Sequence, residues 1–186
     1  MRPPRSASPT SEIAFWAVVF ALVSGAVLGL YAPAFEAQVG LPVVDVDGAS
    51  RPERTLALMA RYGHAGRSDY LAFLSLDCLL PVAGSLLLLA LYDATTRSWR
   101  LPRLARRTLV MVGALPALAD LLENTLYALL AALYPRHAEP LAQLAYLATL
   151  AKLATGSVSM LVLGVLAAVW LRRRAPAPLP HEERLG

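Results

Sequence analysis

The chain has 186 residues, of which 57% are hydrophobic and only 16% are charged. A soluble domain has about 25% charged residues, so the composition excludes an ordinary soluble domain and favours a membrane protein. The net charge of +4 does not indicate nucleic-acid binding, because most arginines flank long apolar segments and act as topology signals there. Sixteen arginines against one lysine indicate a bacterial source.

The first apolar segment, residues 13–31, follows a tail, residues 1–12, that is rich in proline and small polar residues. We expect the tail to be disordered. The uncharged segment is long enough to cross a hydrocarbon core of about 30 Å as a helix. It exceeds the apolar region of a signal peptide, which favours a retained anchor; a signal cleaved near Ala32-Pro33-Ala34 is the alternative.

Small residues recur every four positions along this first segment. Such a stripe allows helices to approach closely, and it favours packing within the chain over contact with a second copy or a partner membrane protein. The stripe consists of Ala17, Ala21, Gly25 and Gly29.

A long connection, residues 32–69, follows the first segment. Ser50-Arg51-Pro52-Glu53 has the pattern of a capping box with proline in the first turn, and Gly63 is placed to end the helix. The pattern predicts a short amphipathic helix over residues 51–62. We expect this helix to lie on the outer membrane face or to cover the membrane-spanning helices.

Three more apolar segments are predicted to cross the membrane as helices, namely residues 70–92, 109–133 and 141–171. Together with the first segment they predict an all-α membrane domain, residues 13–171, folded as an antiparallel four-helix bundle. The remaining residues, 172–186, are predicted to form a second disordered tail.

The distribution of arginine predicts the orientation of the chain. The two tails and the second connection carry eleven arginines, whereas the first and third connections together carry five. Because basic residues concentrate on the cytoplasmic side, we expect both termini to be cytoplasmic and the protein to lie in the bacterial inner membrane.

Four ionisable residues lie inside the predicted spans, where each costs about 2.5–3.5 kcal/mol and usually faces other helices. Counting along each helix at about 1.5 Å per residue brings them to one level in the outer third of the bilayer. We predict that Lys152 pairs with Glu123 or Asp77, and that Asn124 bridges two helices. The predicted cluster consists of Asp77, Asp120, Glu123, Asn124 and Lys152.

The cluster has two interpretations. It could serve only to fix which helices are neighbours. Alternatively, three carboxylates against one ammonium leave an excess of negative charge, which favours binding of a small ligand, a lipid headgroup or a proton. Residues on the outer side could then form a rim over the cluster: His64, Arg67, Tyr70 and Tyr127.

The sequence is compatible with three hypotheses about the function. The first is a membrane protein whose cluster is structural or binds such a ligand, with membrane lipid as its partner. The second is an enzyme acting on a lipid or isoprenoid, with Asp77 or Glu123 as acid or base. The third is a small proton-coupled transporter subunit. No cofactor or metal site is predicted, because the histidines lie apart and Cys78 is the only cysteine.

Two short motifs support a family resemblance. Asp77-Cys78-Leu79-Leu80-Pro81 and Asp120-Leu121-Leu122-Glu123-Asn124, followed by Lys152, resemble a pattern of small, uncharacterised bacterial membrane proteins with four spans. The resemblance covers roughly residues 60–170 and implies the four-span arrangement. It implies no known activity or ligand.

Overall fold

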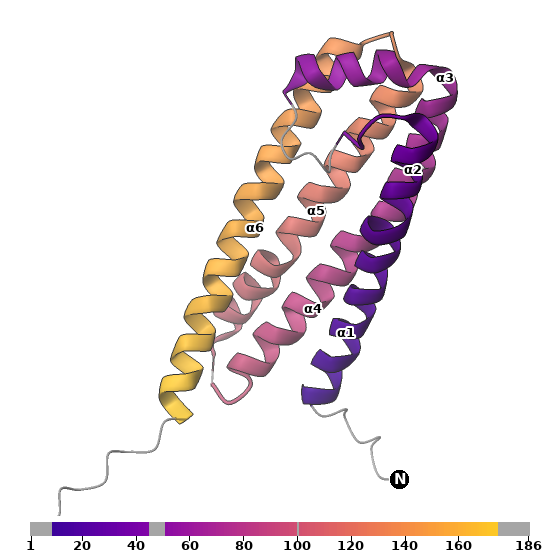
Figure 1. Ribbon diagram of the computed structural model, residues 1–186. Helices are drawn as coiled ribbons and strands as arrows, with labels where there is room; N and C mark the ends of the chain where they lie inside the picture. The colour runs from indigo at the N-terminus through magenta and orange to yellow at the C-terminus, as the bar shows by residue number, and fades with distance from the viewer. Residues whose placement is uncertain (1–8, 45–50, 100, 175–186) are drawn as a thin grey trace, which may run out of the picture.

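The computed structural model describes residues 9–44, 51–99 and 101–174, and within these ranges the chain is almost entirely helical (Figure 1). A π-helical segment, η1, joins the first two α-helices without a break. The elements are α1 (Pro9–Ser24), η1 (Gly25–Tyr31), α2 (Ala32–Val39), α3 (Pro52–Asp77), α4 (Leu79–Thr96), α5 (Arg103–Leu133) and α6 (Ala138–Arg174).

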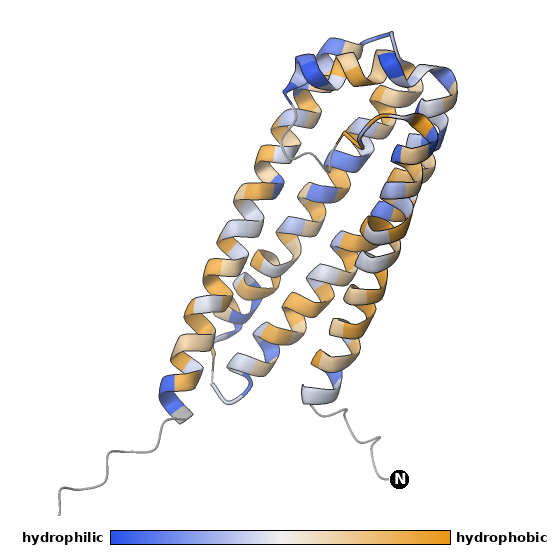
Figure 2. Cartoon of the chain, in the orientation of Figure 1, coloured by the Kyte–Doolittle hydropathy of each residue, from blue (hydrophilic) through white to orange (hydrophobic). Residues whose placement is uncertain are grey.

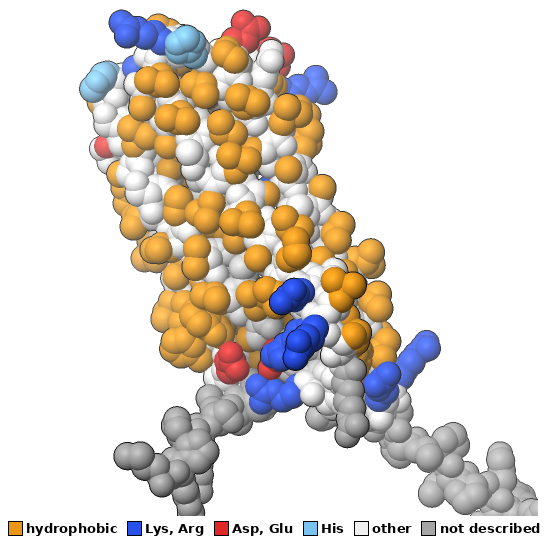
Figure 3. Space-filling model, turned by 180° about the vertical axis from the view of Figure 1, so that it is seen from behind, with side chains coloured by type: hydrophobic (Ala, Val, Ile, Leu, Met, Phe, Trp, Pro, Cys, Tyr) orange, Lys and Arg blue, Asp and Glu red, His pale blue; other side chains and the backbone are white. Residues whose placement is uncertain are grey.

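Four helical stretches are long and apolar enough to cross a membrane: Thr10–Val39, Pro52–Thr96, Arg103–Leu133 and Ala138–Arg173. Their outward surfaces are apolar, and large side chains such as Leu22, Leu118 and Leu161 are mostly exposed. Figure 3 shows an almost continuous hydrophobic surface between two ends that carry the charged residues. This distribution is typical of a multi-pass membrane protein, because hydrocarbon rather than water is the favourable surrounding for such a surface.

The long helices lie side by side in a defined order. α1 packs against α4, α4 against α5, and α5 against α6. Between α1 and α6, the described residues make at most isolated contacts, and Figure 1 shows these two helices on opposite sides of α4 and α5. The first residues of α1 and the last of α6 lie together at one end, here named the terminal end.

The helices extend beyond the predicted spans. Residues 9–12 and 172–174, which were expected in disordered tails, are helical; the rest of both tails lies outside the described residues. Residues 32–39 of α2 and residues 64–69 of α3 also lengthen the first and second predicted spans. Hydropathy detects only the part of a helix that matches the hydrocarbon core, whereas the 37 residues of α6 rise about 55 Å.

Gly63 divides α3 into two helices. Its φ of 62° and ψ of −169° are non-helical and essentially restricted to glycine. The helix before it, Pro52–Tyr62, confirms the short helix that the sequence predicts, and it is named the cap helix below. Ser50 of the expected capping box lies outside the described residues. Figures 1 and 2 show the cap helix, in which hydrophilic and hydrophobic residues are mixed, lying across one end of the molecule, the cap end.

An aromatic core lies beneath the cap helix. The ring of Phe35 in α2 is 5.5 Å from that of Tyr62, which is 5.7 Å from Tyr70, and Tyr70 is 6.5 Å from Tyr127 of α5. All four residues are buried, and the Tyr62 hydroxyl donates a hydrogen bond to the Pro42 carbonyl at 2.5 Å. The cap helix was expected either to lie on the outer membrane face or to cover the spanning helices. These contacts show that it covers the spanning helices.

The sequence favoured packing of the small-residue stripe against other helices of the chain, but the stripe is largely exposed. Ala21, Gly25 and Gly29 are exposed, and a Cβ atom added at either glycine would meet nothing within 4 Å. These three residues lie on an exposed face of α1 and η1, and a spacing of four does not determine whether that face is turned toward the other helices. Contact with a second copy or a partner protein through this stripe stays a prediction.

Candidate functional site

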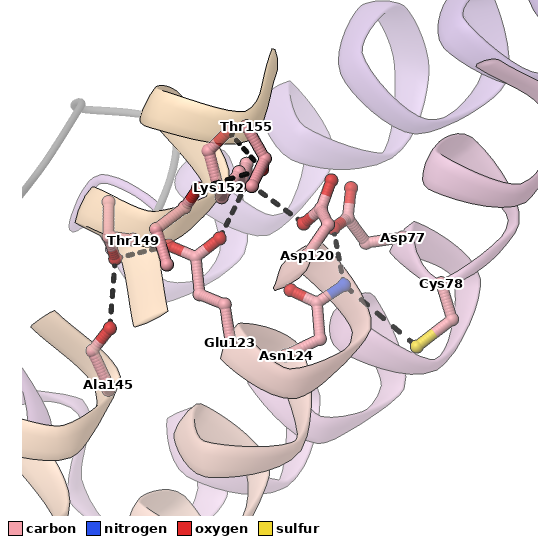
Figure 4. A network of polar contacts seen from close by, with 10 residues as sticks. Asp77, Cys78, Asp120, Glu123, Asn124, Ala145, Thr149, Lys152 and Thr155 are labelled. Carbon is pink, nitrogen blue, oxygen red and sulfur yellow. Dashed lines mark hydrogen bonds and ion pairs between the residues drawn. The ribbon is translucent and has the colours of Figure 1, made fainter. Parts of the chain in front are cut away.

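Pro81 positions the first member of the polar cluster. A proline has no amide hydrogen, so the carbonyl four residues earlier, that of Asp77, loses its helical partner, and α3 ends there. The buried Asp77 side chain faces α5, where Asn124 Nδ2 donates a hydrogen bond to Asp77 Oδ2 at 2.8 Å (Figure 4). Asn124 thus bridges α5 and the α3–α4 junction, as predicted.

Glu123 is the most deeply buried charge of the cluster, with 1% of its surface exposed. Lys152 Nζ of α6 donates to Glu123 Oε2 at 2.6 Å, and the Thr149 hydroxyl donates to Glu123 Oε1. Both carboxylate oxygens are therefore satisfied, which is the condition under which a buried ion pair is tolerated. The sequence predicted that Lys152 pairs with Glu123 or Asp77, and the pairing with Glu123 is confirmed. Thr149 was not anticipated as a partner.

Asp120 is the second partner of Lys152, with 2.9 Å between Asp120 Oδ1 and Lys152 Nζ. Lys152 thus holds two carboxylates, those of Asp120 and Glu123, with one ammonium. Asn124 Oδ1 is shielded from solvent, on a side chain that is 1% exposed, and has no hydrogen-bond donor among the described residues. Buried polar groups are rarely left without a partner.

The cluster carries more negative than positive charge. Asp77, Asp120 and Glu123 supply three carboxylates, and Lys152 supplies the only ammonium among the described residues drawn in Figure 4. The helical rise and period were sufficient to predict that these groups meet. They did not determine which carboxylate each donor would reach, because that depends on how the helices are rotated against one another.

The residues expected to form a rim do not surround an opening. His64 is exposed at the cap end, and Arg67 Nη1 donates to the Met59 carbonyl at 3.1 Å while its guanidinium lies over the ring of Tyr134. Tyr70 and Tyr127 belong to the aromatic core. These side chains help to close the cap end, because the cap helix occupies the space where an opening was expected.

A cavity of about 380 Å³ reaches the cluster from the other direction, and it is named the lateral cavity below. Asp120 and Lys152 line its polar end. Its walls are otherwise apolar or small, because Phe20 of α1, Gly84 of α4 and Gly156 of α6 contribute little or no polar surface. The cavity opens to the side of the molecule, since α1 and α6 do not close over it.

A chain of hydrogen bonds fixes the helices on the far side of this cavity from the cap. Pro116 lacks the amide hydrogen that would bond to the Val112 carbonyl, and the Ser159 hydroxyl of α6 donates to that carbonyl at 2.6 Å instead. The Tyr92 hydroxyl of α4 in turn donates to the Ser159 carbonyl at 2.7 Å. Three helices are thereby held in one register.

Ser159→Ala should therefore destabilise the protein by about 1 kcal/mol, since it leaves the Val112 carbonyl without a donor. In a Pro116→Ala background the same substitution should cost almost nothing, because the restored amide at position 116 can bond to that carbonyl. A double-mutant cycle of unfolding free energies in detergent measures the difference. Equal costs in the two backgrounds would show that Ser159 does not compensate for the proline.

Comparison with protein-family models, with curated proteins and with solved structures found no match for this chain. Within the described residues, no three His, Cys, Asp or Glu side chains are grouped in a way that could hold a metal ion. The resemblance to four-span bacterial proteins stays a prediction, and the function has to be argued from the cluster and the lateral cavity.

Proposed function

We propose that this chain is a multi-pass protein of the cell membrane that binds a membrane-soluble molecule in the lateral cavity. The observation that carries the proposal is the shape of this cavity, which is apolar along its walls and polar at its inner end, where Asp120 and Lys152 lie. Ligand sites are typically concave, mostly apolar and about 300–1,000 Å³ in volume, with a few polar groups that orient the ligand. A side opening between α1 and α6 would admit such a molecule directly from the lipid.

The proposal includes the arrangement of the chain in the membrane. The four long stretches would cross as an antiparallel four-helix bundle, with their exposed leucines in lipid. The terminal end would be cytoplasmic, because Arg103, Arg106, Arg107, Arg172 and Arg173 lie at that end of α5 and α6. The cap helix would lie outside, and the inner membrane of a bacterium remains the proposed location.

The enzyme and transporter hypotheses have no specific observation in their favour. As acid or base, Glu123 would need a free oxygen, yet Thr149 and Lys152 occupy both. Asp77 is bonded to Asn124, and His64 is exposed at the cap end, away from the residues that line the lateral cavity. Binding without chemistry therefore accounts for the geometry with the fewest additional assumptions.

Gly156→Leu tests the proposal by filling the lateral cavity. A Cβ atom at Gly156 would meet nothing within 4 Å, so the leucine can extend into the cavity without a backbone clash. Gly164→Leu is a matched control, because this glycine lies on the same helix, has equally open space and does not line the cavity. Native mass spectrometry after purification in a mild detergent measures what each protein retains.

We expect the wild type and Gly164→Leu to retain a bound small molecule and Gly156→Leu to lose most of it, with similar melting temperatures for both variants. Equal retention of the small molecule by the two variants would contradict the proposal. A wild type that carries only the lipids also found on Gly156→Leu would contradict it as well.

A further inference from the structure

We infer that the molecule bound in the lateral cavity has a single hydrocarbon or isoprenoid chain and a polar group that donates hydrogen bonds, an amine or a hydroxyl. The inference rests on the proposed function above and names the chemistry of its ligand. Three observations support it: the charge of the cluster, its hydrogen-bond acceptors and the volume of the cavity.

The charge of the cluster disfavours an anionic ligand. Lys152 is already within 2.9 Å of two carboxylates, those of Asp120 and Glu123, and Asp77 adds a third carboxylate nearby. A phosphate or carboxylate entering the cavity would meet a surplus of like charge where screening by water is weak. An ammonium would meet the opposite sign, and a neutral hydroxyl would meet no charge penalty of its own.

The hydrogen bonds of the cluster call for a donor. Lys152 and Thr149 donate to Glu123, and Asn124 Nδ2 donates to Asp77. Asn124 Oδ1 is a buried acceptor without a donor among the described residues, and the Asp120 carboxylate shares one ammonium with Glu123. Asp120 lines the cavity, so a donor at the inner end of the cavity could reach it.

The volume of the cavity limits the apolar part of the ligand. A volume of about 380 Å³ equals roughly a dozen water volumes of about 30 Å³ each, and a methylene group is of similar size. The cavity therefore holds one chain of about that many carbon atoms, with any remainder in the lipid outside. Two acyl chains of a phospholipid would have to share this volume, so that only about half as many carbon atoms of each chain would lie inside the cavity.

Three probes with the same chain separate the possible head groups: hexadecylamine, hexadecanol and monohexadecyl phosphate. Each is added at equal mole fraction to phosphatidylcholine nanodiscs that contain the wild type, Gly156→Leu or Asp120→Asn. Occupancy is measured by native mass spectrometry, and the signal of Gly156→Leu serves as the background for nonspecific binding. Asp120→Asn leaves Lys152 paired with Glu123, so this variant keeps the buried ion pair.

We expect the amine, the alcohol or both to occupy the wild type at least tenfold more than Gly156→Leu, and the phosphate to show no such difference. Asp120→Asn should lower occupancy by the amine roughly tenfold, the change expected for about 1.4 kcal/mol. Occupancy by the alcohol should fall less in Asp120→Asn, because a neutral hydroxyl loses no ionic attraction. This difference separates an amine from a hydroxyl head group. Phosphate binding that depends on the cavity would overturn the inference and leave the proposed function standing. If no probe distinguishes the wild type from Gly156→Leu, both fail.

Discussion

Lys152→Met should destabilise the protein by about 3–5 kcal/mol, because it leaves the buried carboxylate of Glu123 without its ionic partner. Glu123 is 1% exposed and lies 2.6 Å from Lys152 Nζ, and only the Thr149 hydroxyl would remain as a donor. Asp120 would lose its partner as well. The free energy of unfolding in mixed detergent micelles measures the loss.

The two partners of this ion pair should not be equally costly to remove, because Lys152 contacts a second carboxylate. Glu123→Gln leaves Lys152 with Asp120, 2.9 Å away, and should therefore cost clearly less than Lys152→Met. Combining both substitutions should recover most of the loss, since the remaining Asp120 side chain is 18% exposed and lies at the cavity. Additive effects of the two substitutions would contradict the observed contacts.

Phe35→Ala should cost about 3–5 kcal/mol, because this ring joins the cap helix to the spanning helices. It is 3% exposed and lies 5.5–6.3 Å from the rings of Tyr62, Tyr70 and Phe73. The measurement is again unfolding in detergent, accompanied by limited proteolysis near the cap helix.

Phe15→Ala is the matched control for this substitution. Phe15 lies on α1, is 59% exposed and faces the proposed lipid, where removing an apolar side chain leaves no cavity in the protein. We expect its cost to stay below about 1 kcal/mol. Similar costs at the two positions would mean that Phe35 does not anchor the cap helix.

Features that depend on the residues of one helix could be predicted from the sequence. Apolar length identified the four long stretches, and Gly63 identified the end of the cap helix, because glycine is needed for its backbone conformation. Helical spacing also predicted that Lys152 would meet Glu123 or Asp77, since the depth and the face of each residue can be derived from its own helix.

Features that depend on several helices together could not be predicted. The lateral cavity exists because α1 and α6 do not pack against each other, and no residue pattern in either helix indicates this. Gly25 and Gly29 lie on an exposed face, against the expectation from their spacing, because the spacing does not determine how the helix is rotated against its neighbours. The pairing of Asp77 with Asn124 likewise follows from the rotation of α5 against the α3–α4 junction.

A structure of the protein in lipid nanodiscs, prepared without added ligand, tests the central claim most directly. We expect elongated non-protein density between α1 and α6 that extends past Gly156 and ends within hydrogen-bond distance of Asp120. The same density should be missing from Gly156→Leu. A wild type in which α1 closes against α6 and no such density lies beside Asp120 would contradict it.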